Sequence, residues 1–152
     1  MLDRRDFLAG AAFCGAFAPF ARADGTRRAA RTFRILRDGS DIGRHHLEAR
    51  LEDGRFVIDI DIDIAVKFLG FTAYRYTLTN REVWTGGRIE SVDSEANDDG
   101  SRGHAHIRGS AEALEVDGSE FSGTAPLSAA TTSYYTPAFL DRRPWISTQS
   151  GK

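Results

Sequence analysis

Apolar and polar residues alternate along the chain from Arg55 to Val66, with the period of a β-strand that has one dry and one wet face. The dry face carries Phe56, Ile58, Ile60, Ile62, Ile64 and Val66, and the wet face carries Asp59, Asp61 and Asp63. The length and regularity of this pattern predict a long strand with one side against a core.

The residues before this strand predict its first partner. If Asp53-Gly54 is a two-residue turn, the preceding segment folds back with matching faces, and a one-residue slip would destroy the match. This register pairs Leu51 with Phe56, Ala49 with Ile58, Leu47 with Ile60, His45 with Ile62, His46 with Asp61 and Arg44 with Asp63.

The residues after the strand predict a second hairpin. A strand from Phe71 to about Trp84 keeps its tyrosines on the dry side if the connection holds an odd number of residues. The three residues 68–70, ending in glycine, suit such a turn. We therefore expect Ile64 opposite Tyr74 and Asp63 opposite Arg75.

Glycine-containing pairs divide residues 31–123 into short segments. Such pairs accept the positive φ angles of tight hairpins. They are Asp38-Gly39, Asp53-Gly54, Gly86-Gly87, Asp99-Gly100 and Asp117-Gly118. No segment in this region has the length and period of a helix. The prediction is an all-β domain, an antiparallel meander forming a strongly curved sheet or an incomplete β-barrel.

The two flanks of this domain differ in composition. Residues 24–30 are polar and arginine-rich and read as a short tether. Residues 124–152 contain Pro126, Pro137 and Pro144 among Ser, Thr, Ala and aromatic residues. Proline cannot donate to a ladder, so we expect this tail to stay out of central strands and to wrap an edge or end of the sheet.

The first 23 residues predict a helical, removable signal. Arg4-Arg5 precedes a short apolar stretch, and Ala21-Arg22-Ala23 offers a cleavage site. The arginine pair is typical of twin-arginine signals, which implies the Tat translocase as a partner and a periplasmic or secreted destination after cleavage behind Ala23. Cleavage removes the sole cysteine, Cys14, so the mature chain has no disulfide and no thiolate metal site.

The charge balance excludes one class of partner. The net charge is −2 over the whole chain, and about −3 without the signal. No basic field exists to attract nucleic acid or anionic lipid.

Several motifs in order resemble one protein family. They are residues 38–43 (Asp-Gly-Ser-Asp-Ile-Gly), Tyr74-x-Tyr76, Glu82-Val-Trp84 through Ile89, Asn97 to Gly100, and Thr132 to Tyr135. Together they are similar to exported bacterial proteins of the domain-of-unknown-function family 6134. The resemblance implies the β fold and the exported address, and no activity. It also implies further strands after the aromatic tail, so we expect this chain to be short at its C-terminus, with an unprotected sheet edge open to a strand-pairing protein partner.

The most conspicuous polar feature is the acidic row, defined as Asp59, Asp61 and Asp63. Its carboxylates stand about 7 Å apart along one strand face, a spacing that suits a hard cation, a binding surface or a solvated charge ladder. The predicted registers place basic groups opposite, which favours the ladder, made of Arg44, His46, Asp59, Asp61, Asp63 and Arg75.

Two histidines, His104 and His106, share one strand face. With His46 and a carboxylate they would supply imidazole ligands for Zn²⁺ or Cu²⁺. The flanking Ala105 and Ile107 lie on the dry face, which places the imidazoles in water. Asn97 to Gly100 lacks the full calcium-loop pattern, and Ser133 lacks a nucleophile-elbow motif. We predict no cofactor and no catalytic residue.

The aromatic residues offer a better route to function. They either fill the core under the tail or line the concave side of the sheet and bind an apolar ligand or lipid. The candidate ligand-binding residues are Tyr74, Tyr76, Trp84, Tyr134, Tyr135 and Trp145, with Phe139 beside them. The sequence favours a non-enzymatic binding or envelope-maintenance module; the alternative is an exported metal-dependent or hydrolytic enzyme that uses the His/Asp face.

Overall fold

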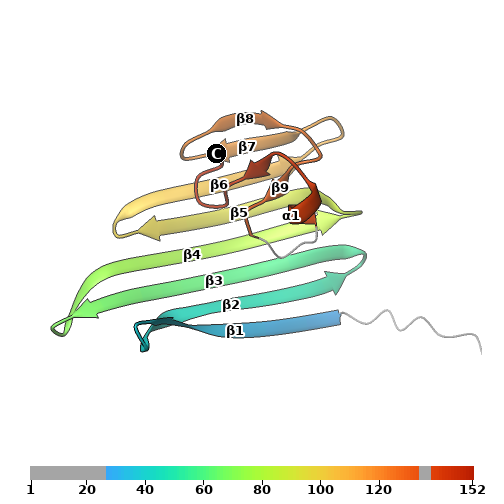
Figure 1. Cartoon of the computed structure of the whole chain (residues 1–152). Helices are drawn as coiled ribbons and strands as arrows, with labels where there is room; N and C mark the ends of the chain where they lie inside the picture. Colours follow the sequence, from blue (N-terminus) through green and yellow to red (C-terminus); the bar gives the residue numbers. More distant parts are fainter. Residues whose placement is uncertain (1–26, 134–137) are drawn as a thin grey trace, which may run out of the picture.

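The alternating segments form one antiparallel sheet of eight strands (Figure 1). The computed structural model describes residues 27–133 and 138–152, so the predicted signal at 1–23 lies outside the described residues. Within those two ranges no helix is long and apolar enough to cross a membrane. The elements are β1 (Arg27–Arg37), β2 (Ser40–Glu52), β3 (Arg55–Phe68), β4 (Phe71–Thr85), β5 (Arg88–Asp98), β6 (Ser101–Gly109), β7 (Leu114–Gly118), β8 (Ser122–Ala125), β9 (Ala130–Thr131), α1 (Ala138–Asp141) and β10 (Trp145–Ile146).

The strands follow one another in sequence order across the sheet, which is open, with β1 and β8 at its edges. This confirms the predicted all-β antiparallel meander. The tether expected at residues 24–30 is corrected at its end, because β1 begins at Arg27. Polar residues join the strand here because Arg28 forms an ion pair with Glu48 of β2 on the wet face.

The predicted pairing of β2 with β3 is confirmed. Leu47 lies opposite Ile60, His46 opposite Asp61 and Arg44 opposite Asp63. The turn residues Asp53 and Gly54 both have positive φ, as a two-residue hairpin requires. The buried side chain of Ile60 and the exposed side chain of Asp61 mark the dry and wet faces.

The predicted pairing of β3 with β4 is wrong by two residues, although the faces are correct. Ile64 lies opposite Tyr76, not Tyr74, and Asp63 lies opposite Thr77. The turn uses two residues, Leu69 and Gly70, with φ of 50° and 85°. The odd residue that restores the alternation is Ala73 of β4. It forms a bulge where the register shifts between Val66 and Lys67 of β3.

Four of the five predicted glycine turns connect strands, and the fifth does not. Asp117-Gly118 ends β7, and Gly118 lies opposite Ala105 in the ladder. A Cβ on Gly118 would collide with the backbone carbonyl of Ser150 and with Gly151. Glycine is needed here because another part of the chain crosses close to the strand, not because the chain turns.

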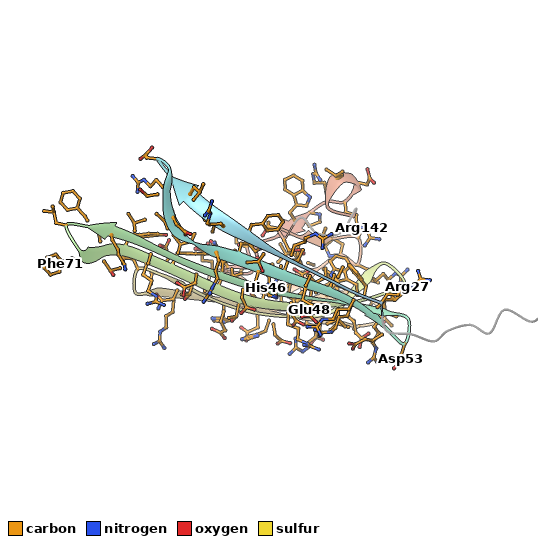
Figure 2. The ribbon with its side chains drawn as sticks, turned by 90° about the horizontal axis from the view of Figure 1, so that it is seen from below. Arg27, His46, Glu48, Asp53, Phe71 and Arg142 are labelled. Carbon is orange, nitrogen blue, oxygen red and sulfur yellow. The ribbon has the colours of Figure 1, made fainter. Side chains whose placement is uncertain are left out.

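The part that crosses is the C-terminal segment, defined as residues 126–133 and 138–152. Its two short strands, β9 and β10, pair in parallel, Ala130 with Trp145. The sequence placed this segment at an edge or end of the sheet; it lies instead on the dry face, in front of β5 to β7 (Figure 1), and reaches Glu82 of β4 through Thr131. Figure 2 shows the same segment, with Arg142, on one side of the sheet. Its small residues and the glycines of β6 and β7 permit this close approach.

One hydrophobic core joins the segment to the sheet. Val92, Ile107 and Leu114 are fully buried. The segment contributes the buried residues Ala129, Ala130 and Ile146 to the same cluster. Burial of each large side chain stabilises the fold by about 1.5–3 kcal/mol.

Candidate functional site

The dry face of the sheet is covered over β4 to β7 and uncovered over β1 and β2. At the covered end, Val116 is 4% exposed. At the uncovered end, Phe33 is 49% and Leu51 is 43% exposed. The C-terminal segment therefore covers one part of an apolar face and leaves the other part open, and apolar and polar side chains meet at its border.

A pocket of about 300 Å³ lies at this border. Its floor comes from β2, β3 and β4, and its wall comes from the C-terminal segment. The lining residues are His45, Ile60, Ile62, Tyr76, Leu78, Asn80, Thr132, Ser133, Ser147, Thr148 and Gln149. We call it the border pocket. Its volume is at the lower end of the ~300–1,000 Å³ usual for ligand sites.

A polar cluster stands behind the pocket, buried between β4 and the C-terminal segment. The carboxyl group of Glu82, which is fully buried, accepts hydrogen bonds from Trp84 Nε1 at 2.8 Å, Asn80 Nδ2 at 2.9 Å and Thr131 Oγ1 at 3.0 Å. Thr131 Oγ1 also lies 2.9 Å from Ser133 Oγ. A buried carboxyl group is tolerated because these donors replace water.

Asn80 connects the cluster to the pocket. It is 4% exposed, and it lines the border pocket. Its Nδ2 is bonded to Glu82, whereas its buried Oδ1 has no hydrogen-bond partner among the described residues. An unpaired buried acceptor costs about 1–3 kcal/mol. A residue that lines the pocket therefore carries an unpaired acceptor, which lies just beneath the pocket surface.

His45 lines the other side of the pocket. Its ring meets the ring of Phe33 edge-on, with centroids 5.9 Å apart. Burial, and secondly the neighbouring charge of His46, lower the pKa of His45 from its ordinary value. The neutral imidazole is favoured as a result, which keeps the pocket lining uncharged near neutral pH.

The opposite, wet face carries a network of ion pairs centred on Arg50. This guanidinium contacts Glu48 at 2.6 Å and Asp59 at 2.7 Å, and Asp59 also contacts Arg81 at 3.1 Å. Hydrogen bonds from Arg50 and then from Arg28 lower the pKa of Glu48. The arrangement gives Asp59 of the acidic row one arginine partner from β2 and one from β4.

The predicted ladder is present in part. Asp63 contacts Arg75 at 3.3 Å, although the register differs from the prediction. Arg44 lies opposite Asp63, and His46 accepts or donates a hydrogen bond with Thr32 at 2.8 Å. Sequence reasoning missed Arg50 and Arg81, although both have the strand parity of the wet face.

The predicted metal ligands are brought together only in part. The rings of His104 and His106 stack with centroids 5.3 Å apart, and His106 contacts Asp93 at 3.2 Å. His46 stands on β2, with β3, β4 and β5 between it and the other two on β6. In the described part of the chain, no three His, Cys, Asp or Glu side chains are placed to hold a metal ion.

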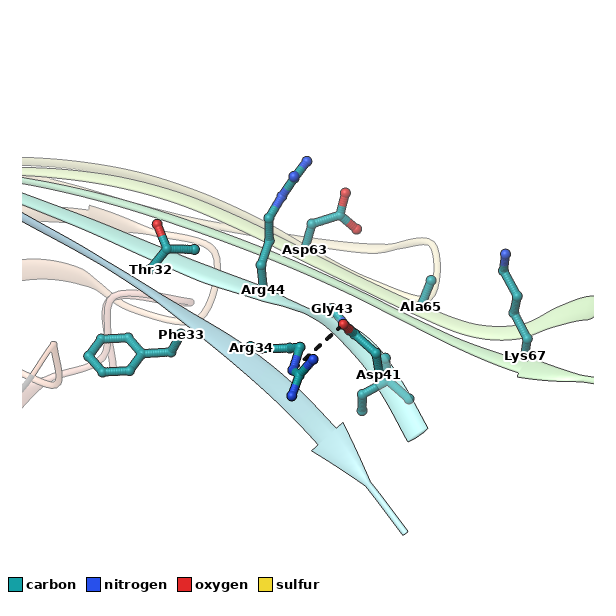
Figure 3. Close-up of a pocket in the computed structure, with 10 residues that line it drawn as sticks. Thr32, Phe33, Arg34, Asp41, Gly43, Arg44, Asp63, Ala65 and Lys67 are labelled. Carbon is teal, nitrogen blue, oxygen red and sulfur yellow. Dashed lines mark hydrogen bonds and ion pairs between the residues drawn. The ribbon is translucent and has the colours of Figure 1, made fainter. Parts of the chain in front are cut away.

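A larger hollow of about 470 Å³ lies at the open edge, over β1, β2 and the end of β3 (Figure 3). Its walls include Arg34, Asp41, Arg44 and Lys67. Arg34 and Asp41 approach to 4.0 Å, with side chains 70% and 57% exposed. The charged groups here are solvated, in contrast to the buried polar groups behind the border pocket.

Comparison with known proteins identifies the family. The model of a domain of unknown function, DUF6134, matches residues 33–152. The chain belongs to the DUF6134 family. No curated protein and no solved structure matches this DUF6134 chain.

The aromatic residues of this DUF6134 domain are divided between core and surface. Trp84 is buried and bonded to Glu82, and Tyr76 lines the border pocket with its hydroxyl accepting from Gln149 Nε2. A hydrogen bond to Asp98 raises the pKa of Tyr74. The exposed Trp145 stacks under Arg143, 3.7 Å from ring centroid to guanidinium carbon. Tyr134, Tyr135 and the side chain of Phe139 lie outside the described residues.

Proposed function

We propose that this chain is an exported, non-enzymatic binding module that takes an apolar small molecule in the border pocket. The observation that supports this most strongly is the pocket itself, which lies where the covered and uncovered halves of one apolar face meet. A ligand body on Ile62 and Leu78 would continue onto the exposed apolar side chains of β1 and β2. Burying that surface contributes about 25 cal/mol per Å².

The C-terminal segment holds the wall of the pocket in a fixed place. The C-terminal segment is anchored at Gly118 and in the core by Ile146, so the pocket wall is held independently of any ligand. A largely preformed site loses little conformational entropy on binding. The neutral lining suits an apolar ligand better than a charged one.

Blocking the pocket tests the binding proposal. We expect octanol to shift backbone amide resonances of β3, β4 and residues 147–149 in two-dimensional NMR spectra of the purified chain. Ile62→Trp fills the pocket and removes these shifts. Ile64→Trp is the matched control, since Ile64 lies next along the same face but does not line the pocket. Equal binding by both variants, or none by the unmodified chain, contradicts the proposal.

Export is part of the same proposal. The pair Arg4-Arg5 and the cleavage site before Asp24 support transport by the twin-arginine route. Replacement of both arginines by lysine should leave the uncleaved precursor in the cytoplasm, whereas Arg22→Lys should not. Cleaved protein in the periplasm after the double replacement would refute the assigned route.

A further inference from the structure

The border pocket has an apolar body and one polar end. Ile60, Ile62 and Leu78 supply the body, and Asn80 stands at the end that backs onto Glu82. Asn80 lies between Ile60 of β3 and Ser94 of β5 in the sheet. The side chain is therefore fixed within the central strands and is not a mobile group at the rim.

The orientation of the Asn80 amide follows from its neighbour. Its Nδ2 donates to Glu82 Oε1 at 2.9 Å, while Glu82 Oε2 accepts from Trp84 and Thr131. Reversing the amide would set two oxygen acceptors against each other. The buried atom without a partner is thus the oxygen Oδ1, an acceptor, and its complement is a hydrogen-bond donor.

The lining determines which donors fit. Among the described residues that line it there is no lysine and no arginine, and the titratable side chains are His45, with a lowered pKa, and the phenol of Tyr76. The carboxyl group of Glu82 stands directly behind Asn80. An anionic head group would meet no cation among these residues and would face an acceptor backed by a carboxyl group. The loss of its hydration on binding would therefore not be offset by favourable contacts.

We propose that the border pocket selects a neutral amphiphile, an apolar chain or ring that carries a hydroxyl group, and that this hydroxyl donates to Asn80 Oδ1 once a small displacement of the lining side chains uncovers that atom. The inference rests on the proposed binding function and adds the chemical class of the ligand. The volume of about 300 Å³ suits a small molecule, or the end of a longer one whose remainder lies on the uncovered face of β1 and β2.

Three probes of equal length test this selectivity. Octanol donates a hydrogen bond, heptyl methyl ether has the same number of heavy atoms and only accepts, and octanoate carries a negative charge. We expect octanol to bind about tenfold more tightly than the ether, the ratio that one hydrogen bond in a desolvated site provides. Octanoate should bind more weakly than octanol at pH 8. The measurement is NMR titration of the purified chain.

The outcomes separate the two proposals. If none of the probes binds, the binding function of the pocket fails. If the ether binds as well as octanol, the pocket binds ligands but the selectivity proposal is overturned; an ordered water that already satisfies Asn80 would give this result. The selectivity proposal is also overturned if octanoate binds best.

Two variants locate the effect. Asn80→Leu should reduce the octanol-to-ether affinity ratio to about one, because the acceptor is gone. Ser94→Ala is the matched control, since this buried hydroxyl lies opposite Asn80 on β5 and donates to the carbonyl of Thr79 but does not line the pocket; the ratio should stay near tenfold. An unchanged ratio in a folded Asn80→Leu chain contradicts the assignment, and the probe series on the unmodified chain decides the case if that variant fails to fold.

Discussion

The buried carboxyl group of Glu82 provides the sharpest test of the structure behind the pocket. Removing it in Glu82→Ala leaves the donors Trp84 Nε1 and Asn80 Nδ2 without an acceptor, whereas Thr131 can turn its hydroxyl hydrogen to Ser133. Each unsatisfied buried donor costs about 1–3 kcal/mol. We therefore expect a loss of about 4 kcal/mol in the free energy of unfolding, a large fraction of the ~5–15 kcal/mol of a typical domain.

Glu82→Gln separates loss of the acceptor from loss of volume. The glutamine keeps one oxygen but turns its NH₂ group toward one of the former donors, so we expect about half the loss, ~2 kcal/mol. Glu90→Ala is the control. This carboxylate is 40% exposed and bonds Thr85 and Arg55 at the surface, and its removal should cost less than about 1 kcal/mol.

Urea unfolding followed by tryptophan fluorescence measures all three variants. Of the two tryptophans, Trp84 is 3% and Trp145 is 40% exposed, so the signal change reports mainly on the core. Equal slopes of free energy against urea are required before midpoints are compared. A Glu82→Ala loss within about 1 kcal/mol of the Glu90→Ala loss would refute the view that this network is satisfied and stabilising.

Three further predictions concern other parts of the fold. Gly118→Ala should cost about 1–3 kcal/mol and make the C-terminal segment more sensitive to protease, because the new methyl group meets Ser150; unchanged proteolysis would contradict the close crossing. Asp59→Ala should cost about 1 kcal/mol more than Asp61→Ala in chemical denaturation, because Asp59 bridges two arginines whereas Asp61 is exposed; equal losses would count against the network. The pKa of Glu48 is lowered in the folded state, so the ionised carboxylate stabilises the fold above pH 4.5, the ordinary pKa, and this stabilisation is lost as the pH falls below that value. Glu48→Gln should flatten the loss of stability in acid, and an unaltered pH profile of the free energy of unfolding would contradict this prediction.

The parts of the fold that follow from local rules could be predicted. The β2–β3 register depends on strict alternation and on one two-residue turn, and both are visible in the sequence around Asp53-Gly54. The β3–β4 register failed because the odd residue lies in a bulge at Val66/Lys67, and no turn residue marks a bulge of this kind. Parity still placed Tyr76 on the dry face.

The candidate site could be predicted only in fragments. Asn80 and Glu82 share the parity of Leu78 and Trp84, so the alternation alone marks two polar side chains on a dry face. That signal points to a buried polar cluster, and sequence reasoning did not use it. The other wall of the pocket comes from residues 132–149, whose path across the sheet depends on long-range packing that no local pattern encodes.

Native mass spectrometry of the protein purified from the periplasm tests the central claim most directly. Binding in the border pocket predicts a chain that lacks residues 1–23 and retains a small neutral molecule, which Ile62→Trp no longer carries and Ile64→Trp does. Recovery of the same mass without any bound molecule, or retention that both variants share, would contradict a binding function for this pocket.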